Sequence, residues 1–155
     1  MSYKGFDFSF QLNYSLGGKI YGDNLTYDEQ IGGSGFDNTT RYVYDHRWQK
    51  PGDRTDVPRF VFGDGSAANN ASTRFLMNGR YLKIRTMSLG YTLPKRITDM
   101  AHLGSARVFM TADNLYTFCA KNFRGFDPAG IGANGIQWWN YPTPRNIMFG
   151  VTIGF

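Results

Sequence analysis

Cysteine is almost absent from this chain, and long apolar runs are absent altogether. Cys119 is the single cysteine among 155 residues, so no disulfide forms within the chain. Mean hydropathy is negative, and no run of about 18 apolar residues occurs, which excludes a transmembrane helix. A membrane sheet is still compatible with low hydropathy, because strands that cross a membrane need only about 10 residues with every second side chain apolar.

Signals for nucleic-acid binding and for catalysis are also lacking. The net charge is +5, but residues 17–77 carry seven Lys or Arg against eight Asp or Glu, and the other basic residues are dispersed. Without a continuous basic stripe, we expect no nucleic-acid partner. His46 and His102 have no triad setting, and the glycines fit neither dinucleotide-binding nor phosphate-loop spacing. We therefore expect no enzyme, no catalytic residue, no metal site and no cofactor.

Aromatic residues are abundant, at 17% of the chain, and they occur together with 19 glycines. Aromatic side chains favour a pleated surface buried on one side, and scattered Gly and Asn favour turns over helices. The composition therefore predicts an all-β protein. The first segment, residues 6–16, alternates apolar and polar residues without a break. Because strands in soluble proteins usually have about 5 or 6 residues, this length favours a membrane span.

Three further segments show strand patterns. Residues 147–155 repeat the alternation and end on an aromatic residue, whereas the ends of soluble domains are commonly polar and frayed. Residues 106–118 alternate more weakly. Residues 80–93 contain a break in phase, because Leu82 and Ile84 fall on the opposite parity to the apolar residues that follow. The break predicts either a β-bulge or a stretch that lies beyond the apolar band.

The connections between these strands alternate in length. Residues 17–77 and 119–144 contain glycine clusters and are expected to form long irregular loops, and residues 94–104 form a short turn with one or two helical turns after Pro94. Antiparallel strands threaded through an outer membrane have long loops on one side and short turns on the other. The pattern predicts about four antiparallel strands of a large transmembrane β-barrel, with long extracellular loops and a short periplasmic turn.

Several stretches carry the motifs of one family. They are YKGFDFSFQLNYSLGGKIY, HRWQKPGDRTDVPRFVFGD, RYLKIRTMSLGYTLPKRI, SARVFMTADNLYTF, and FRGFDPAG with YPTPRNIMFGVTIGF. In this order they resemble the C-terminal part of the SusC/RagA-like TonB-linked outer-membrane proteins, which are TonB-dependent receptors of Bacteroidetes-type bacteria. The resemblance implies that residues 1–155 are the C-terminal portion of a receptor β-barrel, with the plug domain and the earlier strands absent. Export would need an upstream segment, because a strand pattern follows Met1 directly.

The resemblance also implies a function and a set of partners. It implies nutrient import across the outer membrane of a Gram-negative bacterium, with an oligosaccharide or a peptide as the substrate. Energy would come from TonB through the missing N-terminal part, and a SusD-like surface lipoprotein would cover the barrel. Membrane lipids and the barrel assembly machinery are the other expected partners. The segment itself would contribute barrel wall, extracellular loops and an assembly signal.

Together with the resemblance, the alternation of apolar and polar residues assigns roles to particular side chains. Residues expected to face lipid are Phe6, Phe8, Phe10, Leu12, Met87, Leu89, Val108 and Met110. The alternating chain end resembles the signal that the barrel assembly machinery recognises, and it consists of Ile147, Phe149, Val151, Ile153 and Phe155. Aromatics near strand ends fit either an interfacial girdle or ordinary wall positions, and these are Tyr3, Tyr14, Tyr91 and Phe155.

The closing loop offers a candidate surface for a substrate or a partner. Flat aromatic faces beside a carboxylate suit stacking on a sugar ring or gripping a peptide. The alternatives are packing within the loop and contact with a partner protein. The residues concerned are Phe126, Asp127, Trp138, Trp139 and Tyr141.

A protein of a different class is the alternative hypothesis. The chain would then be a soluble antiparallel β carbohydrate-binding module, whose apolar strand faces meet in a core. A receptor barrel would sediment with outer membranes and migrate in a heat-modifiable way. A soluble module would be recovered as a monomer without detergent.

Overall fold

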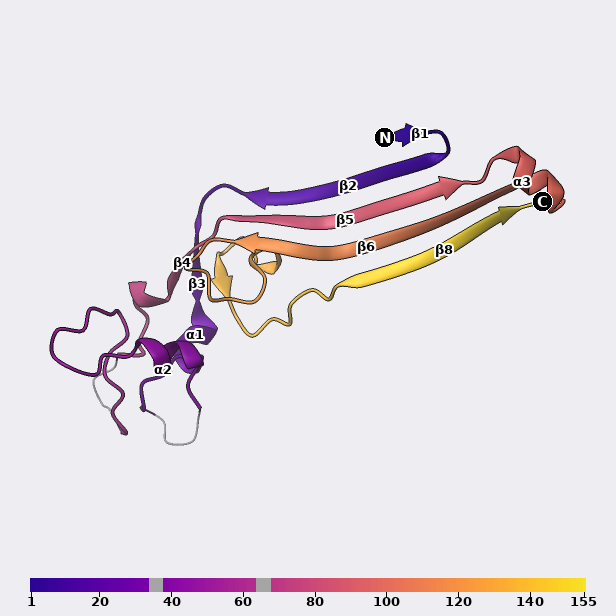
Figure 1. Cartoon of the computed structure of the whole chain (residues 1–155). Helices are drawn as coiled ribbons and strands as arrows, with labels where there is room; N and C mark the ends of the chain where they lie inside the picture. The colour runs from indigo at the N-terminus through magenta and orange to yellow at the C-terminus, as the bar shows by residue number, and fades with distance from the viewer. Residues whose placement is uncertain (34–37, 64–67) are drawn as a thin grey trace.

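The computed structural model describes residues 1–33, 38–63 and 68–155. Four long strands and the two-residue strand β1 form one antiparallel sheet, in the order β1-β2-β5-β6-β8 (Figure 1). The all-β expectation and the four predicted strands are confirmed. The elements of this sheet are β1 (Ser2–Tyr3), β2 (Phe6–Ser15), β5 (Tyr81–Thr92), β6 (Ser105–Cys119) and β8 (Asn146–Gly154).

Short connections join the strands at one end of the sheet. Between β1 and β2, Lys4 and Gly5 have φ of 47° and 87°, and positive φ at both central residues is what a two-residue hairpin of type I′ requires. Between β5 and β6, the helix α3 (Lys95–Met100) begins after Pro94. The predicted helical turn is therefore confirmed. Figure 1 shows α3 and the C-terminus at this end, with the long connections at the other.

The break in phase on β5 is a β-bulge. Ile84 pairs with Leu12 and Thr86 with Gln11, so Arg85 is an extra residue opposite two consecutive residues of β2. On the β6 side the register shifts at the same place, where Asn114 has a φ of 53°. The bulge returns the apolar residues before it to the face of those after it. Of the two alternatives that the sequence left open, the bulge is correct.

The two long connections are more ordered than predicted. They contain β3 (Lys19–Gly22), α1 (Asp23–Asp28), α2 (Arg41–His46), η1 (Thr73–Phe75), β4 (Leu76–Asn78), η2 (Pro128–Gly130) and β7 (Ile136–Gln137). A second sheet has the order β4-β3-β7, in which β3 and β7 run parallel. Because β3 and β7 belong to different connections, this sheet joins the two into one loop assembly. The expectation of irregular loops was wrong for these elements, since their partners lie far away in sequence.

Both clusters of buried apolar residues lie in the loop assembly, while the small Ala106 and Ala112 are buried on β6. One cluster consists of Ile20, Leu25, Phe75 and Met77, and a second of Ile31, Val43 and Val57. Phe75 and Val43 are fully buried, whereas Phe10 on β2 is 61% exposed and Phe149 on β8 is 78% exposed. In the described part of the chain, the apolar side of the long strands therefore does not meet a core. Among the described helices, none has the length and apolar character needed to cross a membrane.

Candidate functional site

The first functional feature is an exposed apolar face that extends across all four long strands. Cross-strand pairing places these side chains in rows, for example Phe8, Leu89, Met110 and Phe149. Beyond the bulge the same face continues through the row of Leu12, Ile84 and Tyr116 and the row of Tyr14, Leu82 and Phe118. All eight residues predicted to face lipid lie on this face, in the rows that begin at Phe6, Phe8, Phe10 and Leu12.

The proposed assembly residues occupy the edge of this face. Ile147, Phe149, Val151 and Ile153 are exposed side chains of β8, and each pairs with a residue on the apolar face of β6. Phe155 follows the end of β8 and is 99% exposed. The structure therefore places four of the five residues on one surface and the fifth directly after it.

The opposite face is polar, and an ion pair crosses it. Arg107 of β6 donates to both carboxylate oxygens of Asp7 on β2, with distances of 3.2 Å from Nε and 2.6 Å from Nη2. The pair passes over Gly90 of β5, where an added Cβ would lie 2.6 Å from Asp7 Oδ1. On β8, the ring of Phe109 similarly occupies the space beside Gly150. Glycine is needed at both positions, because a neighbouring side chain occupies the space that a Cβ atom would take.

A buried ion pair attaches the closing connection to this polar face. Lys83 Nζ lies 2.6 Å from Asp127 Oδ2, and the two side chains are only 7% and 12% exposed. The other oxygen of Asp127 accepts a hydrogen bond from the backbone N–H of Ala129, which caps η2. Both oxygens are thus engaged within the chain. The expectation that Asp127 offers its carboxylate to a ligand is corrected, because the carboxylate anchors the loop.

The aromatic residues of the closing connection divide into separate places. Trp139 packs against Tyr27 of α1 with ring centroids 5.1 Å apart, and its Nε1 donates to Asp28 Oδ1 at 3.4 Å. Phe126 and Tyr141 instead line a small cavity. Trp138 is half exposed and has no ring partner among the described residues. The structure therefore does not gather the predicted surface into one cluster. It adds Tyr27, which the sequence analysis missed because the pairing joins residues 112 positions apart.

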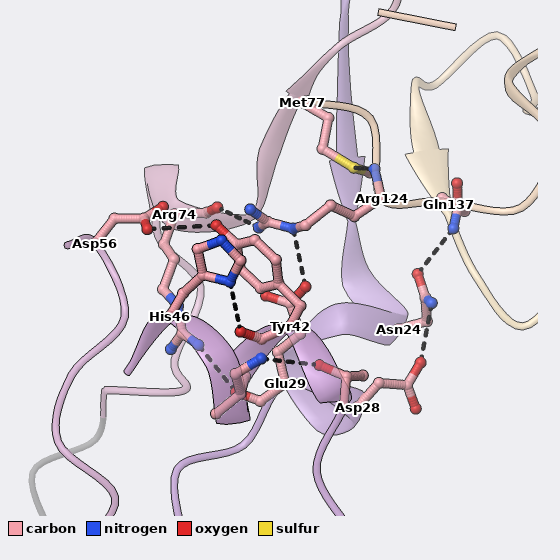
Figure 2. A network of polar contacts seen from close by, with 12 residues as sticks. Asn24, Asp28, Glu29, Tyr42, His46, Asp56, Arg74, Met77, Arg124 and Gln137 are labelled. Carbon is pink, nitrogen blue, oxygen red and sulfur yellow. Dashed lines mark hydrogen bonds and ion pairs between the residues drawn. The ribbon is translucent and has the colours of Figure 1, made fainter. Parts of the chain in front are cut away.

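A buried polar network connects the two long connections (Figure 2). Arg124 Nε lies 2.8 Å from Glu29 Oε1, and the Glu29 side chain is 1% exposed. The Arg124 guanidinium also lies over the ring of Tyr42, 4.4 Å from its centroid, and donates to Arg74 O at 3.1 Å. Arg74 in turn donates to Glu29 O at 3.0 Å. One arginine of the closing connection therefore binds three segments of the first.

Burial dominates the electrostatics of this network. Removal from water raises the pKa of the Glu29 carboxyl, and the nearby guanidinium of Arg124 only partly opposes that shift. Burial also lowers the pKa of Arg74. A second link runs from Gln137 Nε2 to Asn24 Oδ1 at 3.2 Å and from Asn24 Nδ2 to Asp28 Oδ2 at 3.1 Å. This link ends at the carboxylate that also holds Trp139.

Known proteins are similar to this chain in sequence and in structure. No protein-family model matches the chain. The chain is 30% identical to TonB-dependent receptor P26 and 27% identical to TonB-dependent receptor P3, both of Formosa agariphila, and 27% identical to TonB-dependent receptor SusC of Bacteroides thetaiotaomicron. Each match covers 100% of this chain but only 16%, 15% and 14% of the relative. The chain thus spans about one sixth of the length of these relatives.

Solved structures agree with these relatives. The RagAB peptide importer in its closed-closed state matches with a TM-score of 0.79 and 26% identity, and the match covers 99% of this chain and 16% of that chain. Its open-open state matches with a TM-score of 0.76 and 25% identity over the same shares of the two chains. In its strands, its loops and its sequence, the chain is similar to a segment of the TonB-dependent receptors of the SusC/RagA type.

Proposed function

We propose that the chain is the C-terminal wall segment of an outer-membrane β-barrel that imports a nutrient. The observation that carries this proposal is the exposed apolar face of β2, β5, β6 and β8. The four strands have 10, 12, 15 and 9 residues, and about 9–11 residues of a tilted strand cross a bilayer. A face of this kind is stable in lipid, because apolar side chains lose no hydrogen bonds when lipid takes the place of water around them.

In this proposal the two ends of the sheet lie on opposite sides of the membrane. The hairpin at Lys4-Gly5 and the helix α3 are periplasmic, and the loop assembly is extracellular. The substrate is an oligosaccharide or a peptide, and a SusD-like surface lipoprotein covers the loop assembly. The pairing of β3 with β7 supports an extracellular role, because a lid protein needs a defined surface to dock on.

The remaining partners follow from the rest of the receptor and from β8. TonB supplies energy through the N-terminal part of the complete receptor, which lies outside this segment. The barrel assembly machinery recognises Ile147, Phe149, Val151, Ile153 and Phe155. Trp139 with Tyr27 is the aromatic pair that we propose for contact with substrate or lipoprotein, because both rings stay more than half exposed, at 53% and 62%, while Asp28 fixes the indole.

The proposal is tested on the complete receptor expressed in its host. We expect it to sediment with outer membranes and to migrate faster before heating than after, as a folded barrel does. Loss of TonB is expected to abolish uptake of the substrate while leaving its binding at the cell surface intact. Recovery as a soluble monomer without detergent would favour the carbohydrate-binding module and would refute the receptor proposal.

A further inference from the structure

The bulge on β5 places a charged side chain where regular pairing would not. Arg85 is the extra residue between Ile84 and Thr86. In the phase of the residues after the bulge, Arg85 would lie on the apolar face with Met87 and Leu89, but the extra residue leaves Ile84 on the apolar face and Thr86 on the polar face. Arg85 lines a polar cleft of about 440 Å³ together with Lys83 and Asn13. The bulge therefore adds an arginine to the polar face.

Arg85 differs from the other cations of the sheet. The four long strands contain three basic residues, Lys83, Arg85 and Arg107. Lys83 is paired with Asp127, and Arg107 is paired with Asp7. Within residues 1–33, 38–63 and 68–155, the side chain of Arg85 has neither an ion pair nor a hydrogen bond. It is also exposed. Its guanidinium is thus available to a ligand in the cleft.

Besides Arg85, the cleft contains neutral hydrogen-bonding groups for the polar part of a ligand that carries one negative charge. It lies where the sheet meets the closing connection, since Ala129 and Thr143 also line it. The amides of Asn13 and Asn146 are available as donors and acceptors. Asp113 lines the cleft as well, with its Oδ1 accepting from Thr86 Oγ1 at 2.9 Å. Its negative charge opposes a polyanion, so the cleft suits one anionic group flanked by neutral hydrogen-bonding groups.

We propose that Arg85 binds a single carboxylate of the transported substrate in this cleft. The inference rests on the proposed import function and specifies one chemical group of the substrate. A guanidinium matches a carboxylate with two parallel hydrogen bonds, and the neighbouring amides serve the peptide or sugar groups beside it. Two substrate sources carry such a group, the C-terminus of a peptide and a uronic acid of an oligosaccharide.

The test compares matched acid and neutral probes on the purified complete receptor in detergent. The peptide pair is N-acetyl-tetra-alanine as the free acid and as the C-terminal amide. The sugar pair is cellobiouronic acid and its methyl ester. By equilibrium binding, we expect the wild-type receptor to prefer one free acid over its neutral form about tenfold to hundredfold, as for a charge-assisted hydrogen-bonded pair. The pair that shows the preference identifies the source.

Three variants decide whether Arg85 is responsible. Arg85→Gln is expected to remove the preference, and Arg85→Lys to retain part of it. Arg96→Gln, an exposed cation of α3 at the opposite end of the sheet, is the matched control and is expected to behave like wild type. The proposal is overturned if wild type prefers neither free acid, or if Arg85→Gln keeps the preference.

A carboxylate from another part of the receptor is the competing partner for Arg85. In that case Arg85→Gln lowers the stability of the receptor and leaves the preference unchanged, which also overturns the proposal. Failure of this inference is distinct from failure of the import function. Arg85→Gln is expected to keep outer-membrane location and heat-modifiable migration, whereas a wrong import function shows itself in the wild-type receptor, whatever residue is at position 85.

Discussion

The buried pair of Lys83 and Asp127 gives the sharpest prediction about how the closing connection is held. With side chains only 7% and 12% exposed and atoms 2.6 Å apart, removal of one partner leaves a charge without compensation in a place with little water. Such a change costs about 3–5 kcal/mol, and Asp127→Ala also removes the cap of η2, which costs about 1 kcal/mol more. We therefore expect Asp127→Ala to release residues 119–144 from the sheet locally.

Local release is measured by protease cleavage of the closing connection in the complete receptor at the surface of intact cells. A local opening free energy reduced by 3–5 kcal/mol raises cleavage by about two to four orders of magnitude, if the intact loop opens only rarely. Asp99→Ala removes an exposed carboxylate of α3 and is the matched control, which should leave cleavage unchanged.

A double-mutant cycle separates the ion pair from general disruption. The single variants of the cycle are Lys83→Met and Asp127→Leu. Their combination removes both charges and fills the space with apolar side chains, so we expect the double variant to resist cleavage better than either single variant. If the two single effects simply add in the double variant, the two residues do not interact and the reasoning is refuted. Cleavage of Asp127→Ala at the wild-type rate would have the same meaning.

Three further predictions concern the sheet, its end and the buried network. Phe149→Arg on the apolar face is expected to destabilise the folded barrel by about 2–4 kcal/mol and to lower its yield, whereas Met148→Arg at the adjacent polar-face position is expected to be tolerated. Heat-modifiable migration measures the yield of folded barrel for both variants, and equal yields would contradict the lipid-facing assignment. Deletion of Phe155 is expected to impair assembly far more than Asn69→Ala in a loop, and similar amounts of assembled barrel for the two would remove the assembly role. Because the pKa of Glu29 is raised by burial, the loop assembly should lose stability as pH rises above about 4.5, the ordinary value, and through the raised pKa. Glu29→Gln should abolish that dependence in protease-protection assays between pH 4 and pH 8, so a slope unchanged by the substitution would exclude Glu29 as its source.

The strands were predictable from sequence, because period 2 is a local property. Residues 6–16 needed only alternation, and the observed β2 covers Phe6–Ser15. The break at Leu82 and Ile84 left a bulge as one of two alternatives, and the sequence did not show what such a bulge does. Only the register reveals that it keeps one apolar face continuous and adds Arg85 to the other.

The loop assembly was not predictable by the same means. Its core brings Ile20 together with Phe75 and Met77, and its ion pair joins Glu29 to Arg124. These contacts link positions far apart in sequence, and no periodicity in the segments between them reports the pairing. Asp127 illustrates the consequence, because beside aromatic residues it resembled a ligand group, and only the position of Lys83 shows that it is an anchor.

The location of the buried clusters has a consequence for how such proteins diversify. Because Phe75, Met77 and Val43 are buried among the connections, these segments obey the substitution rules of a small folded domain. Exchange of a whole connection between related proteins must therefore transfer its partner connection as well, since Phe123 and Ile131 of the closing connection pack against the core of the first and Arg124 pairs with Glu29. New specificities are then gained either by single changes on exposed rings such as Trp139 or by inheritance of both connections together.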